Sequence, residues 1–250
     1  MTTATSFPNP SPAEFAPGLA IQGFAAPLSL SQFKLIAFDM DSTLISIECI
    51  DEIADAVGRK AEVAAITEAA MRGEITDFKE SLRRRLALLK GVTLADMERV
   101  YTERLQINPG AAELIAACQK AGMKVLLVSG GFTFFADRVK DRLNIDFARS
   151  NQLEIVGGEL TGGLVMQSWG DICDGAEKRR TLLEVASLLG IEPHECIAMG
   201  DGANDLQMMG VCSDAGGLSV AYHAKPKVRE QAMVAIQEGG LDRLLEVVRP

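Results

Sequence analysis

Histidine, aromatic residues and long apolar runs are all scarce in this sequence. His194 and His223 are the only histidines and have no metal-type spacing, so a histidine-ligated zinc site is not expected. No apolar run approaches the ~20 residues that cross a bilayer, so we expect no membrane as a partner. No Lys or Arg precedes Lys34, so the basic start of a secretory signal is missing. These absences favour a cytoplasmic protein.

Basic residues are outnumbered by acidic ones, 25 to 34, and the formal net charge is −9. A nucleic-acid-binding protein normally carries a basic face, so we expect no nucleic-acid partner. An acidic protein that handles phosphate needs a few well-placed Lys and Arg residues instead. The five cysteines are scattered and odd in number, which indicates free thiols in a reducing compartment.

Short apolar runs alternate with helical patterns along most of the chain. The runs of strand length are 34–38, 124–128, 196–199 and 217–221. Helical patterns such as 109–121 and 176–189 separate them. Strands that alternate with helices predict an α/β fold with a mostly parallel sheet. In such a sheet the active site lies beyond the carboxyl ends of the strands.

Two segments interrupt this alternation. Residues 46–107 are almost wholly helical in pattern and fall between the first two strands, so we expect an inserted helical cap over the site. Residues 153–166 alternate around two glycines and predict a small β-hairpin. The Ala-, Pro- and Ser-rich residues 1–30 are expected to form a flexible arm. The core is then expected at 31–45 and 108–250.

Two carboxylates follow the first predicted strand at once. Asp39 and Asp41 are two residues apart in extended chain, so both can face one site. One can attack phosphorus while the other handles a proton, and a bound Mg²⁺ would compensate their charges. The alternative is a polar turn in which Asp and Ser only cap a helix.

A glycine-rich turn follows the second strand. Ser129, Gly130 and Gly131 place a hydroxyl and bare backbone N–H groups before a helix, where an anion would bind. A plain glycine turn into the helix is the alternative.

Two further features lie nearer the C-terminus. Lys178 would supply positive charge, unless it belongs to a solvated helix face together with Arg179 and Arg180. The run GDGAND joins flexible glycines to Asp201 and Asp205, whose hard oxygens are of the kind that Mg²⁺ prefers. A simple Asx turn is the alternative there.

These four elements in this order resemble the signature of the haloacid dehalogenase superfamily of phosphotransferases, from about Lys34 to the C-terminus. Within it, the stretches FDMDSTLISIECIDEIA, SLRRRLALLKG, VSGGF and AMGDGANDLQMM are similar to the phosphoserine phosphatase family. The resemblance implies a Rossmann-like core with an inserted cap, and a Mg²⁺-dependent phosphoric monoester hydrolase. The expected reaction converts O-phospho-L-serine to L-serine and phosphate, the last step of serine biosynthesis. The short arm argues against the extra regulatory domain of some members.

In that family, a Glu early in the cap and an Arg on a cap helix hold the amino-acid part of the substrate. Glu48 matches the first. An apolar stripe runs along the relevant helix through Phe78, Leu82, Leu86 and Leu89. At about 100° per residue, Arg84 points almost opposite this stripe, whereas Arg85 borders it. Arg85 is therefore preferred for the substrate carboxylate, with Arg84 as the alternative.

The resemblance also implies roles at the phosphoryl site. Asp39 would be the nucleophile that forms an aspartyl phosphate, and Asp41 the general acid and base. The metal ligands would be the Asp39 carboxylate, the Asp41 backbone carbonyl and Asp201. The groups expected to bind or orient the phosphoryl oxygens and their neighbours are Ser129, Gly130, Lys178, Asn204 and Asp205.

Two other functions remain open. A related phosphotransferase would move the phosphoryl group to homoserine or another small alcohol, because acceptor choice depends on cap shape. A catalytically silent ligand-binding protein on this fold would be favoured by loss of Asp39, Asp41 or Lys178, and none of these is lost. The sequence leaves the oligomeric state open, with a homodimer as one option.

Overall fold

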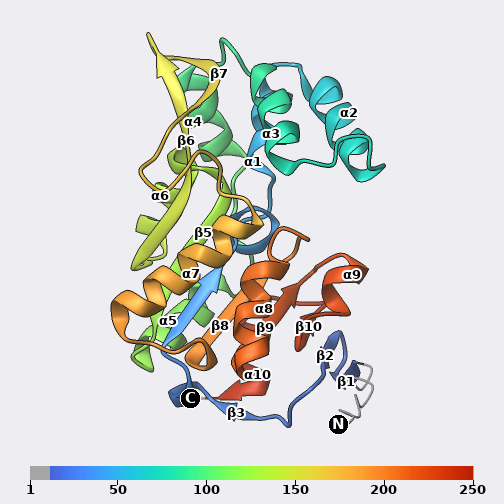
Figure 1. Cartoon of the computed structure of the whole chain (residues 1–250), viewed down its shortest axis with the longest axis vertical. Helices are drawn as coiled ribbons and strands as arrows, with labels where there is room; N and C mark the ends of the chain where they lie inside the picture. Colours follow the sequence, from blue (N-terminus) through green and yellow to red (C-terminus); the bar gives the residue numbers. More distant parts are fainter. Residues whose placement is uncertain (1–11, 250) are drawn as a thin grey trace, which may run out of the picture.

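The computed structural model describes residues 12–249, and a nine-stranded sheet forms its centre (Figure 1). The strands are β1 (Ala13–Ala16), β2 (Leu19–Ile21), β4 (Leu35–Phe38), β5 (Lys124–Phe132), β6 (Phe147–Val156), β7 (Glu159–Val165), β8 (Cys196–Gly200), β9 (Leu218–Tyr222) and β10 (Val234–Ile236). Their order is β1-β2-β10-β9-β8-β4-β5-β6-β7. All neighbours from β10 to β6 are parallel, whereas β1, β2 and β7 pair antiparallel at the two edges. The predicted α/β fold with a mostly parallel sheet is confirmed.

Helices cover both faces of this sheet. The core helices are α5 (Ala111–Lys120), α6 (Thr133–Arg142), α7 (Gly175–Leu189), α8 (Leu206–Ala215), α9 (Pro226–Arg229) and α10 (Leu244–Val247). On the central strand β4, Ile36 and Phe38 pack into the apolar layer that includes α5 and α6. Leu35 and Ala37 pack into the opposite layer with α7 and α8. A continuous apolar run suits a parallel strand that is covered on both faces.

The predicted strands agree with the structure except at the end of β5. The expected strand stops at Val128, whereas β5 continues through the glycine turn to Phe132. The pairing register between β5 and β6 shifts between Val128 and Phe132. The extra residues bulge out of the ladder there, which sets the Ser129–Gly131 segment toward the sheet edge.

Four helices between β4 and β5 form what we call the cap, at the upper end of Figure 1. They are α1 (Cys49–Ala56), α2 (Lys60–Met71), α3 (Phe78–Ala87) and α4 (Leu94–Glu103). The chain segments that enter and leave the cap lie side by side, since the Ser46 N–H donates to the Gln106 carbonyl at 3.0 Å. The Asn108 side chain also donates to the Thr43 carbonyl at 2.8 Å. The cap is therefore fastened to the core directly after β4.

The predicted hairpin is confirmed as β6 and β7, and its tip lies against the cap. The Gly91 N–H donates to the Leu160 carbonyl at 2.8 Å, and the Leu94 N–H donates to the Gly158 carbonyl at 3.0 Å. The hairpin thus joins the sheet to the loop between α3 and α4.

The flexible arm predicted at 1–30 needs correction. Residues 1–11 of it lie outside the described residues. The rest contains β1 and β2, and β2 pairs antiparallel with β10. A short strand β3 (Leu28–Ser29) also pairs with β11 (Val248–Arg249). The prediction was wrong for this part because Leu19 is fully buried against strands more than 200 positions later, which local composition does not reveal. Among residues 12–249, no helix has the length and apolar character that crossing a membrane requires.

Candidate active site

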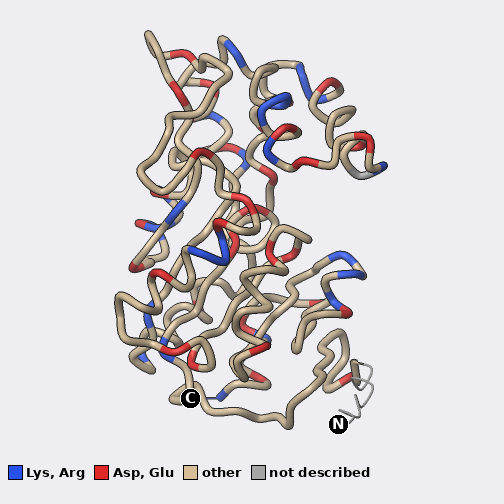
Figure 2. The backbone as a smooth tube through the Cα atoms, viewed as in Figure 1, with Lys and Arg blue, Asp and Glu red and all other residues tan. Residues whose placement is uncertain are grey.

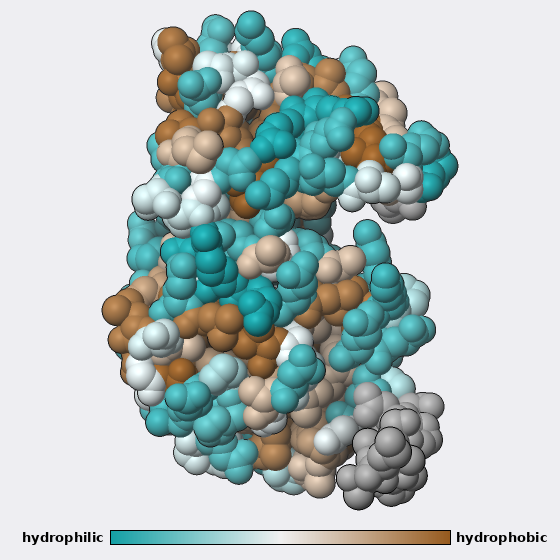
Figure 3. All heavy atoms as spheres, in the orientation of Figure 1, coloured by the Kyte–Doolittle hydropathy of each residue, from teal (hydrophilic) through white to brown (hydrophobic). Residues whose placement is uncertain are grey.

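The carboxyl ends of β4, β5 and β8 meet at one edge of the sheet, beneath the cap, and Figure 3 shows a recess between the cap and the core on one side. After β4, residues 40–44 form one wide turn, closed by a hydrogen bond from the Ile45 N–H to the Met40 carbonyl at 3.0 Å. Ser42 adopts a left-handed conformation in it, with φ 57°. Asp39 directly precedes the turn and Asp41 lies in it, and acidic residues gather there in Figure 2. The two predicted carboxylates therefore belong to the chain segment that joins the core to the cap.

Lys178 reaches this edge from the first turn of α7 and is fully buried. Its Nζ lies 2.6 Å from Oδ1 of Asp39 and 2.6 Å from Oδ1 of Asp205. Burial alone would lower the pKa of Lys178, but Asp205 and Asp39 outweigh it and raise the pKa above its usual value. The alternative of a solvated face is wrong for Lys178, whereas Arg179 and Arg180 are exposed.

Asp205 organises the loop after β8. Its Oδ2 accepts the N–H groups of Asp201 at 3.1 Å and Gly202 at 3.0 Å, while its Oδ1 accepts from Lys178. A Cβ on Gly200 would lie 2.5 Å from the Asp205 Cβ, so only glycine leaves room for this arrangement. Asn204 is half-buried, and its side chain folds back over Gly202.

The glycine turn of β5 lies directly against the Asp41 turn. The Ser129 Oγ is fully buried and accepts the Gly131 N–H at 2.8 Å. A Cβ on Gly131 would lie 3.1 Å from Oδ2 of Asp41, which is tighter than ordinary contact. The Gly130 carbonyl accepts from the Asn151 side chain at 2.7 Å. Sequence reasoning missed Asn151, because it lies inside β6 with no motif around it.

Three carboxylates form a cluster that suits a metal. Oxygens of Asp39, Asp201 and Asp205 all lie within 4.8 Å of one another. Burial, followed by the charge of Asp205, raises the pKa of Asp39 well above its usual value and that of Asp201 to about 7. Asp201 has one weak side-chain contact, from the Thr43 hydroxyl at 3.4 Å. Two buried carboxylates and one half-buried carboxylate that share the single charge of Lys178 fit a hard divalent cation such as Mg²⁺.

Asp41 differs from this cluster. Its Oδ1 is buried and has no hydrogen-bond partner among the described residues, and its Oδ2 accepts only a long bond from the Cys49 N–H at 3.4 Å. Burial, reinforced by the charge of Glu48, raises the pKa of Asp41 to about 8. A carboxyl group in these surroundings holds its proton near neutral pH, as a general acid requires.

Glu48 and Arg85 approach the site from the cap. Glu48 precedes α1, and its Oε1 accepts from the Ser42 hydroxyl at 2.6 Å. Arg85 is half-buried on α3, and its Nε is buried without a hydrogen-bond partner among the described residues. Burial lowers the pKa of Arg85, and the charges of Asp51, Glu48 and Asp41 oppose that shift. Arg85 thus faces acids at the cap–core junction.

The other two arginines of the triplet point elsewhere. Arg84 is exposed and pairs with Glu80 on its own helix, and Arg83 pairs with Asp171. This burial agrees with the helical phase that favoured Arg85. The prediction of a buried apolar stripe on this helix was wrong for Phe78. This residue is 36% exposed, whereas the other members of the stripe are buried. The Phe78 ring instead lies over the glycine turn, 3.5 Å from where a Cβ of Gly130 would stand.

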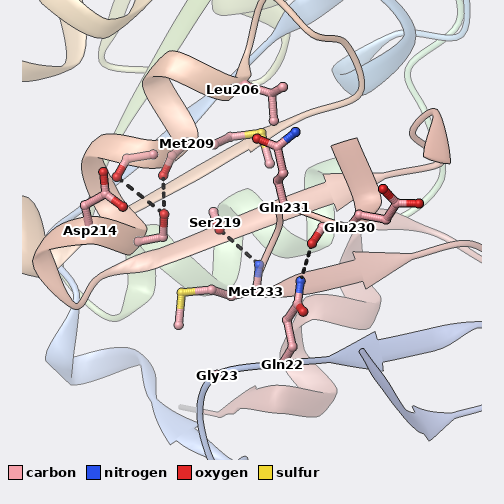
Figure 4. A pocket seen from close by; sticks show the side chains of 11 residues that line it. Gln22, Gly23, Leu206, Met209, Asp214, Ser219, Glu230, Gln231 and Met233 are labelled. Atoms are coloured by element: carbon pink, nitrogen blue, oxygen red, sulfur yellow. Dashed lines mark hydrogen bonds between the residues drawn. The ribbon is translucent and has the colours of Figure 1, made fainter. Parts of the chain in front are cut away.

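A separate pocket lies on the side of α8 near β10 (Figure 4) and has a volume of about 580 Å³. None of the predicted site residues lines it. The Gln22 side chain donates to the Glu230 and Ala232 carbonyls, and the Met233 N–H donates to Ser219. The pocket therefore lies apart from the phosphate-handling groups at the sheet edge.

Fold and site together define a haloacid dehalogenase-like hydrolase, and the family of that description matches residues 36–210. A phosphoserine phosphatase of Polaromonas sp. is 69% identical over 95% of this chain and 99% of its own length. One of Albidiferax ferrireducens is 70% identical over 96% of this chain and 99% of its own length. The chain belongs to the phosphoserine phosphatase family, as the sequence motifs predict.

A solved structure gives the same result. The structure of a phospho-aspartyl intermediate analogue of phosphoserine phosphatase is 37% identical, with a TM-score of 0.77. The match covers 87% of this chain and 99% of that one.

Proposed function

We propose that this protein hydrolyses O-phospho-L-serine to L-serine and phosphate, with Asp39 as the nucleophile. The observation that carries the proposal is the convergence of Asp39, Lys178 and the Ser129–Gly131 turn at one sheet edge, beneath a cap that presents Arg85. The phospho-aspartyl analogue studied in a relative supports a covalent route. Five buried free cysteines accord with a reducing, cytoplasmic location and a place in serine biosynthesis.

The two oxygens of the Asp39 carboxylate differ in their surroundings. Its Oδ1 accepts the Met40 N–H at 2.7 Å and pairs with Lys178, whereas its Oδ2 has no hydrogen bond from another described residue. Oδ2 therefore attacks phosphorus, and the bond from phosphorus to the seryl oxygen breaks. Asp41 gives its proton to that oxygen, so that serine leaves as the neutral alcohol.

The second half of the reaction frees Asp39. Asp41, now a carboxylate, takes a proton from a water molecule that attacks the aspartyl phosphate. The bond between phosphorus and Oδ2 of Asp39 breaks, and inorganic phosphate leaves. In both halves the Ser129 hydroxyl, the Gly130 N–H and Lys178 donate to the phosphoryl oxygens, where negative charge builds up in the transition state.

Asp39, the Asp41 backbone carbonyl and Asp201 would hold Mg²⁺. When bound, the ion would compensate the negative charge of the phosphoryl group and the carboxylates. Asp205 belongs to the same cluster, but its oxygens already accept from Lys178 and two N–H groups, so its role is to position Lys178.

The cap would supply the specificity for an amino acid. Glu48 would accept from the substrate ammonium, and Arg85 would bind the carboxylate through its planar fork of donors. Asn204 would orient the substrate or its neighbours from the loop after β8.

The test is a phosphate-release screen over small phosphomonoesters with and without Mg²⁺. We expect phosphoserine to have the highest kcat/KM, and release to require the metal. Transfer of the phosphoryl group to added homoserine, without release of phosphate, would favour the related phosphotransferase. No turnover of any phosphomonoester by folded, Mg²⁺-loaded protein would favour the silent binding protein.

A further inference from the structure

Asn151 is a polar residue of the core that the reaction described above does not use. It lies within β6, next to β5 in the sheet (Figure 1), and it is fully buried. A buried amide group is unfavourable unless it is hydrogen-bonded, so its partners show what it is for. Because no part of the residue is exposed, Asn151 does not contact a substrate directly.

The two ends of the Asn151 amide bind two different segments of the site. Its Nδ2 donates to the Gly130 carbonyl at 2.7 Å, and its Oδ1 accepts the Cys173 N–H at 2.8 Å. Cys173 lies shortly before α7, the helix whose first turn carries Lys178. The two segments also touch directly, since a Cβ on Gly130 would lie 3.3 Å from the Cys173 carbonyl oxygen. Asn151 therefore joins the glycine turn of β5 to the start of α7.

The peptide group between Gly130 and Gly131 is held at both ends. Its carbonyl accepts from Asn151, and its N–H donates to the Ser129 Oγ at 2.8 Å. A Ser129 oxygen that accepts this N–H points its own hydrogen elsewhere, where it can donate to a phosphoryl oxygen. Hydrogen bonds in such a chain polarise one another in the same direction, so the bond from Asn151 also strengthens the hydroxyl as a donor.

We propose that Asn151 is a positioning residue for the phosphoryl site, in which its amide fixes the Ser129–Gly131 turn relative to Lys178. The proposal rests on the proposed function, because it assigns the phosphoryl oxygens to donors of this turn and to Lys178. These donors come from two elements, β5 and α7, and must meet one phosphoryl group in the transition state. Asn151 connects the two elements from a third, β6, and so sets the spacing between their donors.

The test compares Asn151→Leu with Ser219→Ala. Leucine is close to asparagine in shape, but it leaves the Gly130 carbonyl and the Cys173 N–H without their partner. Ser219 is a matched control, because its buried Oγ accepts the Met233 N–H at 3.0 Å, in a part of the sheet away from the site. Both variants remove buried hydrogen bonding between a side chain and the backbone. Asn151→Ser is a milder replacement that decides the question if Asn151→Leu does not fold.

We expect Asn151→Leu to lower kcat about 10- to 100-fold, and Asn151→Ser about 3- to 10-fold, because the donors no longer match the transition state. KM for phosphoserine should change less than about threefold, and kcat for p-nitrophenyl phosphate should fall by the same factor, since both substrates share the phosphoryl group. Ser219→Ala should lower the thermal unfolding midpoint but change kcat less than about twofold. In a Ser129→Ala background, Asn151→Leu should lower kcat less than about threefold further, since residues that act through one contact are not additive.

Wild-type kcat in a folded Asn151→Leu variant would overturn the proposal, and so would its full loss repeated in the Ser129→Ala background. A loss confined to phosphoserine would place Asn151 at the amino-acid end of the site, which also overturns it. If neither Asn151 variant folds, the residue serves the fold and the proposal fails.

The same measurements separate this proposal from the proposed function. If the wild type releases phosphate from p-nitrophenyl phosphate but not from phosphoserine, the proposed substrate is wrong, and the role of Asn151 is still decided on the generic ester. If Ser129→Ala is silent on both substrates, the Ser129 role in the proposed function fails, and the Asn151 role with it.

Discussion

Replacing Arg85 by alanine removes the charge proposed to bind the substrate carboxylate, and leaves the phosphoryl site untouched. Arg85 is half-buried, and its Nε has no hydrogen-bond partner among the described residues. Arg84, the preceding residue, is exposed and pairs with Glu80 on its own helix. Arg84→Ala is therefore a matched control that differs in the direction of the side chain.

The size of the effect follows from the contact that is lost. A charge-assisted hydrogen bond to a partly buried ligand contributes about 1.5–3 kcal/mol. At ~1.4 kcal/mol per factor of ten, Arg85→Ala should lower kcat/KM for phosphoserine about 10- to 150-fold. Arg84→Ala removes an exposed pair worth about 0.3–0.5 kcal/mol of stability, and should leave kcat/KM nearly unchanged.

The assay is phosphate release from phosphoserine and from p-nitrophenyl phosphate, which has no carboxylate to lose. Arg85→Ala should act on the first substrate and barely on the second. A selective loss in Arg84→Ala alone would show that the wrong arginine was chosen. Equal losses on both substrates in Arg85→Ala would mean that this residue supports the phosphoryl site or the folding of the cap.

Three further outcomes are expected. Asp39→Asn should keep the thermal unfolding midpoint but lower kcat more than about 100-fold, since an amide is a poor nucleophile; a folded, non-deamidated variant with higher activity would exclude Asp39 as the nucleophile. Chelation with EDTA should stop phosphate release, and added Mg²⁺ should restore it; full activity of metal-free enzyme would contradict the metal site. Gly200→Ala should cost about 1–3 kcal/mol in denaturant unfolding, because its Cβ would meet Asp205. Gly210→Ala lies inside α8, and its Cβ would meet only Oδ2 of Asp214 at an ordinary 3.9 Å. It should be neutral or stabilising by about 0.5–1 kcal/mol, and equal destabilisation of the two variants would refute the clash.

Local pattern was sufficient for the elements whose own residues carry the signal. The apolar runs that became β4, β8 and β9 are buried on both faces and read as continuous apolar stretches. Asp39 and Asp41 directly follow β4, so a prediction of where this strand ends also predicts where the two residues lie. The angular position of each arginine around α3, relative to the apolar stripe, also distinguished Arg85 from Arg84, because it depends only on residues of one helix.

Features that depend on distant partners could not be predicted in this way. Lys178 lies in a run of charged residues typical of a solvated helix face, and only Asp39 and Asp205, remote in sequence, make it a buried residue. Leu19 lies in an Ala- and Pro-rich segment, and its burial depends on β10. Phe78 follows the apolar spacing of α3, yet its ring lies over Gly130, a residue of the core that is remote in sequence.

The charges buried at the sheet edge explain why a phosphatase in an acidic protein of net charge −9 would depend on a metal. The site contains the carboxyl groups of Asp39, Asp41, Asp201 and Asp205, and one ammonium group, that of Lys178. Burial and the charge of Asp205 raise the pKa of Asp39 and Asp201 there, so keeping these groups as carboxylates is unfavourable with Lys178 alone. A phosphoryl group brings further negative charge to the same place. A divalent cation at the carboxylate cluster would favour the ionised form of these groups and would relieve the repulsion between them and the substrate.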